Sequence, residues 1–153
     1  ASLGVYVDHV RIAASAQVLV AVWESNADVP DPRSNIATGS DTDIIASFSS
    51  DGSTWSPPFP IAGFASYDSS RDIAPAVSGV SGGFVVTWQS MNSLNDLVGE
   101  DWDVLITRSS DGGQTWSFPV SLNGDASYDG PQQHDTQPSI QCHQESPACV
   151  ASW

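Results

Sequence analysis

Hydrophobic residues in this chain fall into short runs, and three of these runs end in a tryptophan. They are Val18–Trp23, Phe84–Trp88 and Cys149–Trp153, and consecutive tryptophans lie 65 residues apart. β-Branched and aromatic residues dominate the runs, which favours strands. No segment shows a sustained helical period of apolar residues. The pattern therefore predicts an all-β chain built on a repeated unit.

Further landmarks recur in the same order, so the repeat extends beyond the tryptophans. The segment 43–55 matches the segment 103–116. Each starts with an aspartate and has a second aspartate 8 positions later. The sequence Ala-Ser-Tyr-Asp occupies 65–68 and again 126–129, and Asp-x-x-Pro occupies 72–75 and again 135–138. We therefore place one unit at about 9–63, a second at about 73–123 and an incomplete third at about 136–153.

Each unit has the composition of four short strands joined by polar turns. In the second unit the strands are predicted near 76–78, 83–90, 103–109 and 117–122, with Gly, Ser, Asp and Asn between them. The long connections 25–42 and 90–102 are predicted to be surface loops, since the first of them is rich in proline. A repeated four-stranded unit of this kind is the signature of a β-propeller blade, so the chain is expected to hold about two and a half blades.

The turn after the third predicted strand carries a motif that occurs twice. The motif reads Ser-x-Asp-x-Gly-x-Thr-Trp in the second unit, and a copy one residue shorter stands in the first. It resembles the Asp-box of the sialidase superfamily, also called the bacterial neuraminidase repeat. The resemblance implies a six-bladed or similar propeller, in which these residues hold a turn and do not catalyse. The matching positions are Ser49, Asp51, Gly52 and Trp55, then Ser109, Asp111, Gly113, Thr115 and Trp116.

The same resemblance implies what an active sialidase would need: three arginines for the substrate carboxylate, a tyrosine–glutamate pair and an acidic aspartate. The chain has only four arginines, and no complete catalytic set can be placed on it. Arg11 is the one candidate for a ligand-binding arginine, because its surroundings weakly match the family's Arg-Ile-Pro segment. No catalytic residue is predicted, and whether the parent protein is an enzyme is left open.

Charge narrows the range of partners. The formal net charge is −14, there is no lysine, and 15 of the 18 acidic residues are aspartate. Such a surface repels nucleic acid and anionic membranes but attracts cations. The acidic stretch around 100 makes a Ca²⁺ site one expectation, and solvated turn carboxylates are the alternative. The candidate ligands are Asp96, Glu100, Asp101 and Asp103, and Asp41 and Asp43 are the repeat equivalents of the last two.

Two further features bear on location and binding. Cys142 and Cys149 flank the turn between two predicted strands, so we expect a disulfide and a secreted or cell-surface protein. Trp102 has Thr42 as its counterpart, which makes it a candidate for stacking on a sugar ring, although packing within the blade is the competing role. There is no apolar run long enough to insert into a membrane.

The length conflicts with a closed ring, because 153 residues hold only about two and a half units and propellers close with about four to eight blades. We expect either a segment of a longer propeller or several chains that share one ring. The preferred function is a non-catalytic extracellular recognition or scaffold domain that binds glycan or protein. The alternatives are part of a sialidase-type glycoside hydrolase and a structural protein that assembles with other copies of itself.

Overall fold

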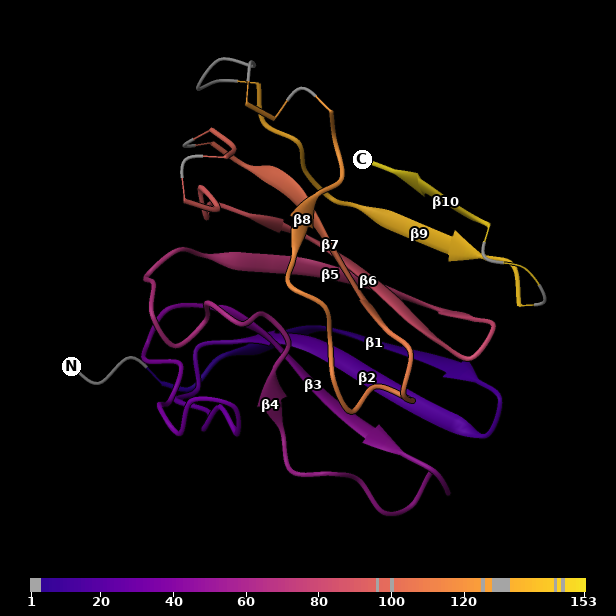
Figure 1. Ribbon diagram of the computed structural model, residues 1–153. Coiled ribbons are helices and arrows are strands. Elements are labelled where there is room, and N and C mark those ends of the chain that lie inside the picture. The colour runs from indigo at the N-terminus through magenta and orange to yellow at the C-terminus, as the bar shows by residue number, and fades with distance from the viewer. Residues whose placement is uncertain are drawn as a thin grey trace.

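The computed structural model describes residues 4–95, 97–99, 101–124, 126–127, 133–144, 146 and 148–153. Within these ranges all regular structure is β-strand, in three antiparallel sheets that fan out one beside the next (Figure 1). None of the described residues belongs to a helix that could cross a membrane. The all-β, propeller-type architecture expected from the repeat is confirmed.

The three sheets follow the chain order, and we call them the first, second and third blade. The first blade contains β1 (Val7–Ser15), β2 (Val18–Ser25), β3 (Asp43–Ser49) and β4 (Phe59–Pro60). The second contains β5 (Asp72–Val80), β6 (Gly83–Ser90), β7 (Asp103–Ser109) and β8 (Val120–Ser121). The third contains β9 (Ser139–Cys142) and β10 (Cys149–Ser152). Within each blade, strands that follow one another in the sequence pair with one another.

Two strand bounds of the second blade differ from the prediction. β5 begins at Asp72 and not near 76, because a bulge between Ile73 and Ala76 lets the strand continue through Pro75. β8 is only two residues long, because Pro119, directly before it, has no N–H to donate to β7.

Strand alternation places one core between each pair of blades. Val20 and Val22 of β2 pack against Phe84, Val86 and Trp88 of β6 in the larger core. Val85, on the opposite face of β6, packs with residues of the third blade in the smaller core. The second blade is therefore covered on both faces, and its β6 is buried along its whole length.

Close backbone packing holds the blades together. A Cβ on Gly79 of β5 would lie 2.0 Å from the Ala14 carbonyl oxygen of β1. Gly113, with φ +84°, brings the turn after β7 against the first blade, where a Cβ would lie 2.5 Å from Val20 Cγ2. Both positions therefore need glycine. The turn that contains Gly113 helps to fix the second blade on the first.

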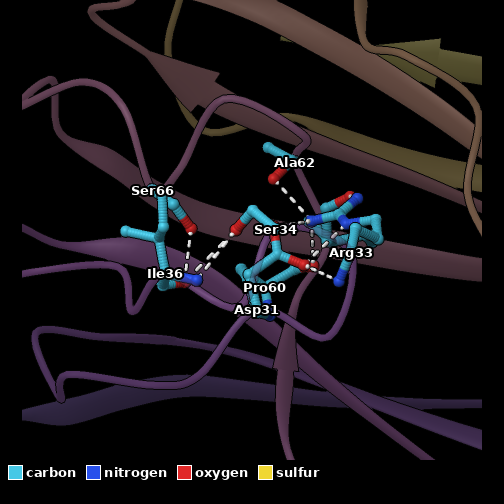
Figure 2. A network of polar contacts seen from close by, with 8 residues as sticks. Asp31, Arg33, Ser34, Ile36, Pro60, Ala62 and Ser66 are labelled. Carbon is cyan, nitrogen blue, oxygen red and sulfur yellow. Dashed lines mark hydrogen bonds and ion pairs between the residues drawn. The ribbon is translucent and has the colours of Figure 1, made fainter.

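The long loop after β2 is fixed by an ion pair between a buried aspartate and a partly exposed arginine, drawn in Figure 2. Asp31 is only 1% exposed, and its Oδ1 accepts from Arg33 Nε at 2.8 Å. Arg33 Nη2 also donates to the carbonyl oxygens of Pro60 and Ala62, both at 2.9 Å. The loop is thus attached to the segment around β4 of its own blade.

The outer sheet faces at the two ends of the stack carry exposed apolar side chains. On β1, Val7, Val10 and Ile12 are each more than half exposed, and in the third blade Val150 is 75% exposed. Cys142 and Cys149 form a disulfide between β9 and β10, with their Cα atoms 4.0 Å apart.

Candidate functional site

A groove runs over the beginnings of β1, β5 and β9, where all three blades meet. It has a volume of about 440 Å³. Its wall is made by residues at equivalent places of the three blades: His9, Arg11, Ile73, Ala74, Pro75, Gln89, Gln137 and Pro138. A groove built by several blades is the place where a propeller could bind one ligand with residues from distant parts of its sequence.

Each blade contributes a non-glycine residue with positive φ to this groove. The values are 50° at His9, 54° at Ala74 and 56° at Gln137. Residues with a Cβ rarely adopt this conformation, so the surrounding structure must hold it in place. Bulges lie at the starts of β1 and β5, around His9 and Ala74, and Gln137 stands just before β9. All three residues line the groove.

Side chains from the preceding blade hold two of these positive-φ residues. Glu24 Oε2 accepts from the Ala74 N–H at 2.6 Å, and Gln89 Oε1 accepts from the Gln137 N–H at 2.9 Å. Glu24 and Gln89 stand at equivalent ends of β2 and β6, one 65-residue period apart. We call this repeated contact the inter-blade clamp, and it sets the geometry of the groove.

Glu24 is also the centre of a polar cluster that sequence reasoning missed. Tyr6 Oη donates to Glu24 Oε1 at 2.7 Å, and His9 Nδ1 lies 3.0 Å from Glu24 Oε2. The hydrogen bond to Glu24 raises the pKa of Tyr6 above its ordinary value, and Asp8 adds to this. Tyr6 has no counterpart in the other units, so the repeat gave no signal for it.

This cluster resembles a tyrosine–glutamate pair but is arranged to hold structure. Glu24 is 2% exposed, its Oε1 accepts from the Tyr6 hydroxyl, and its Oε2 accepts from the Ala74 N–H and lies 3.0 Å from His9 Nδ1. Both oxygens of Glu24 are therefore already engaged by groups of the protein. The same saturation makes Asp8, His9 and Glu24 an unsuitable metal site, although their ligand atoms lie within 4.8 Å of one another.

Arg11 is the only arginine among the groove residues. Its guanidinium donates one hydrogen bond to the Val10 carbonyl oxygen, and the residue is exposed at the surface. Arg33 is used in the loop anchor, Arg71 lies 6.0 Å over the ring of Trp102, and Arg108 is exposed on β7. The described residues therefore offer this groove one guanidinium and not three.

The other predicted ligand residue, Trp102, is not among the residues that line the groove, although its carbonyl oxygen accepts from the Asp135 N–H at 2.7 Å. Its side chain is partly exposed, and Arg71 covers one face of its indole. A sugar could stack only on the remaining face, so Trp102 stays a prediction with no support from the groove.

The two turns that the sequence predicts to be Asp-boxes have closely similar hydrogen bonds. In the first, Asp51 Oδ1 accepts from the N–H groups of Ser53 and Thr54 at 2.8 and 2.7 Å, and these bonds lower the pKa of Asp51 to about 2. In the second, Asp111 accepts from the Thr115 N–H at 2.9 Å and from its hydroxyl.

Serines and tryptophans complete the two turns. The Ser49 hydroxyl accepts from the Gly52 N–H, and the Ser109 hydroxyl accepts from the Gly113 N–H. Trp116 packs against the larger core and donates to the Gly113 carbonyl, while Trp55 is partly buried. All of these contacts are internal to the turns or to the blades, as expected of structural residues.

The predicted calcium ligands are only partly within the described residues, since Asp96 and Glu100 lie outside them. Asp101 and Asp103 are 3% and 1% exposed. His134 Nδ1 lies 3.9 Å from Asp101 Oδ2, and Asn123 Nδ2 donates to Asp103 Oδ1 at 3.4 Å. A second acidic cluster lies at the equivalent place in the first blade, where oxygens of Asp41, Asp43 and Asp68 lie within 4.8 Å of one another.

The fold of this chain is similar to that of solved structures, whereas its sequence matches no known family. No family model and no curated protein matches the sequence. Among solved structures, a Hadza microbial sialidase matches with TM-score 0.54 and 19% identity over 89% of this chain. An α-L-arabinanase of Penicillium chrysogenum in complex with arabinobiose matches with TM-score 0.61 and 13% identity over 97%. Trypanosoma rangeli sialidase matches with TM-score 0.51 and 20% identity over 76%.

The fold is that of a sialidase-like β-propeller. The matched regions cover 29%, 39% and 20% of those three proteins, so the chain corresponds to a minor part of each. At these identities the likeness concerns the fold alone. In this sialidase-like propeller the groove over β1, β5 and β9 is the site at which residues of three blades come together.

Proposed function

We propose that this chain is the glycan-recognising part of an extracellular propeller and that it binds without cleaving. The observation that carries the proposal is the groove shared by three blades, with Arg11 as its single cation and amide side chains of Gln89 and Gln137 beside it. Amides and a guanidinium are suited to hydroxyl and carboxylate groups of a sugar, and the prolines offer an apolar floor. The solved structures of similar fold are sialidases and an arabinanase, which supports a carbohydrate ligand.

The two groups nearest to a catalytic pair are already committed to holding the fold. Tyr6 donates to Glu24, and Glu24 is buried and accepts from the Ala74 N–H at the entry of β5. Gln89 makes the equivalent contact to the Gln137 N–H without a carboxylate, which supports a structural role for Glu24. An extracellular location is supported by the disulfide between Cys142 and Cys149, since such bonds persist in oxidising compartments.

Binding is tested by calorimetric titration of the chain with sialyllactose, lactose and arabinobiose. We expect the anionic glycan to bind more tightly than lactose, and Arg11→Ala to weaken its binding by at least about tenfold, the loss of one charge-assisted contact. Arg108→Ala is the matched control, because Arg108 is an exposed arginine on β7 outside the groove. Binding that is equal for both variants, or no binding at all, would contradict the proposal.

Turnover separates the proposal from its main alternative. Fluorogenic sialosides and arabinofuranosides incubated with the chain should release no fluorophore above the buffer blank. Release that is lost in Glu24→Gln would instead favour a part of a glycoside hydrolase.

The exposed sheet faces favour one further candidate function, self-assembly, in which other copies of the chain complete the stack of blades. Val7, Val10 and Ile12 on β1 present an apolar surface of the kind that a neighbouring blade would cover. Light scattering of the chain tests this: a closed ring of copies would appear as a defined oligomer, whereas a monomer at all concentrations would exclude self-assembly.

A further inference from the structure

A cluster of aspartates, two of them buried and two partly buried, lies where the first blade joins the second, apart from the groove. It contains Asp41 and Asp43 at the start of β3, Asp68 in the connection after β4, and Asp72 at the start of β5, and we call this set the junction carboxylates. The Asp72 N–H donates to the Thr42 carbonyl at 2.7 Å, which brings the two strand starts together.

The junction carboxylates carry more negative charge than the protein around them neutralises. Asp43 is 1% exposed, and neither of its oxygens has a hydrogen-bond partner. Oδ2 of Asp41 and Oδ1 of Asp68 are likewise buried without a partner. Asn92 Nδ2 donates to Asp68 Oδ2, and none of the ion pairs among the described residues reaches the cluster.

A buried carboxylate without a partner is costly unless a proton or a cation neutralises it. Burial raises the pKa of Asp43 to about 9, and repulsion from Asp72, Asp41 and Asp68 contributes. Burial also raises the pKa of Asp72 to about 8, against the opposing influence of Ser90 and Trp88. Without a cation the cluster therefore retains protons at neutral pH, and a cation would displace them.

We propose that Asp41, Asp43 and Asp68 bind one Ca²⁺ ion, with Asp72 adding negative charge behind Asp43. Ca²⁺ takes oxygen ligands at about 2.3–2.6 Å, so oxygens on opposite sides of one ion are about 4.6–5.2 Å apart. The oxygens of these three aspartates lie within 4.8 Å of one another, which meets that requirement. Three carboxylates offer up to six oxygens, and water from the partly exposed side of Asp41 can complete the shell.

Such an ion would join two blades at one point. Asp43 belongs to β3, whereas Asp68 lies in the connection that leads into β5. Bound Ca²⁺ thus ties the third strand of the first blade to the entry of the second, independently of any glycan in the groove. Failure of this proposal would leave the glycan proposal untouched, and the converse also holds.

The test is a calorimetric titration of CaCl₂ into the whole chain after treatment with EDTA. We expect one ion per chain with a dissociation constant on the order of 10⁻⁴ M, as in extracellular modules. The melting temperature should rise by about 5–10 °C at about 10 mM Ca²⁺, the shift that saturation at about a hundredfold excess over the dissociation constant gives for a chain of this size. MgCl₂ should bind more weakly.

Asp43→Asn is the decisive variant, because its amide keeps the size of the side chain and removes the charge. It should lose calcium binding yet melt in EDTA at the same temperature as the unmodified chain or higher, since the repulsion is relieved. Asp68→Asn, at a less buried position, should weaken binding at least tenfold and decides the matter if Asp43→Asn fails to fold. Asp103→Asn, the equivalent change in the second blade, should retain binding, and Asp51→Asn replaces it as control if needed.

Three outcomes would overturn the proposal. The first is no heat and no melting shift up to about 10 mM Ca²⁺. The second is unchanged binding in Asp43→Asn or, if that variant does not fold, in Asp68→Asn. The third is loss of binding in Asp103→Asn with retention in Asp43→Asn, which would move the ion to the second blade.

Discussion

The first and second blades place an aspartate at the same point of the third strand but surround it differently. Hydrogen bonds from Ile61 to Ile44 and from Leu122 to Val104 put Ala62 and Asn123 at equivalent positions. Asn123 donates to Asp103 in the second blade, whereas Ala62 has no side-chain donor to offer Asp43. The two blades therefore share one backbone arrangement but differ in whether a side-chain amide hydrogen-bonds the buried aspartate. A repeat of this kind can gain a cation site in one copy by losing a single amide.

The blades also differ in how deeply they bury their equivalent tryptophans, and this difference gives the largest expected effect. Trp88 is fully buried because the first blade covers its face of β6, whereas Trp23 on β2 is only partly buried. Trp88→Ala should lower the free energy of unfolding by about 3–5 kcal/mol, and Trp23→Ala by about half as much or less. Urea unfolding followed by far-UV circular dichroism measures both, and equal losses would contradict the asymmetry.

The charge difference between the blades predicts a pH dependence of the calcium-free chain. The junction carboxylates of the first blade, Asp43 with pKa about 9 and Asp72 with pKa about 8, hold protons that the unfolded chain releases above about pH 4. The folded state binds more protons over that interval, so its stability falls as the pH rises. We therefore expect the melting temperature in EDTA to fall steadily as the pH rises from about 5 to about 9.

Calcium and Asp43→Asn provide the controls for that prediction. Both should flatten the melting temperature against pH, because each removes the need for the Asp43 carboxyl to hold a proton. A curve in EDTA that rises toward pH 9 would show that other groups dominate the titration.

Removing the amide of the second blade should make it resemble the first. Asn123→Ala deprives Asp103 of a donor and is expected to lower stability by about 1–3 kcal/mol. Ser121→Ala is a suitable comparison, since the Ser121 hydroxyl binds Asn123 and not Asp103, and its cost should be about 1 kcal/mol or less. Thermal unfolding of both variants would contradict the assignment if Ser121→Ala were the more damaging change.

The blades could be predicted from the sequence, because strands and turns depend on alternation and turn residues that repeat with a fixed period. The periodic tryptophans and the two Asp-box turns are therefore visible in the order of residues alone. The groove is not, since its shape depends on positive φ at Ala74 and Gln137, residue types that ordinarily avoid that conformation. Tyr6 escapes notice because it has no repeat partner.

The acidic cluster shows a second limit of sequence reasoning. Spacing identified Asp41 and Asp43 as equivalents of Asp101 and Asp103 and drew attention to the denser acidic stretch of the second blade. What distinguishes the first blade is the missing amide at Ala62 and the approach of Asp68. Both arise from contacts between segments distant in sequence, which composition and spacing do not record.

The inter-blade clamp has a direction, and the direction has a consequence for synthesis. Glu24 precedes Ala74 in the chain, and Gln89 precedes Gln137, so the acceptor is always made before the strand that it receives. The second and third blades therefore leave the ribosome after the oxygen that fixes the entry of their first strand. An insertion between a clamp residue and the strand that it binds would lengthen the time between the synthesis of the two. Substitution of Glu24 or Gln89 would remove the hydrogen-bond acceptor for the first strand of the next blade.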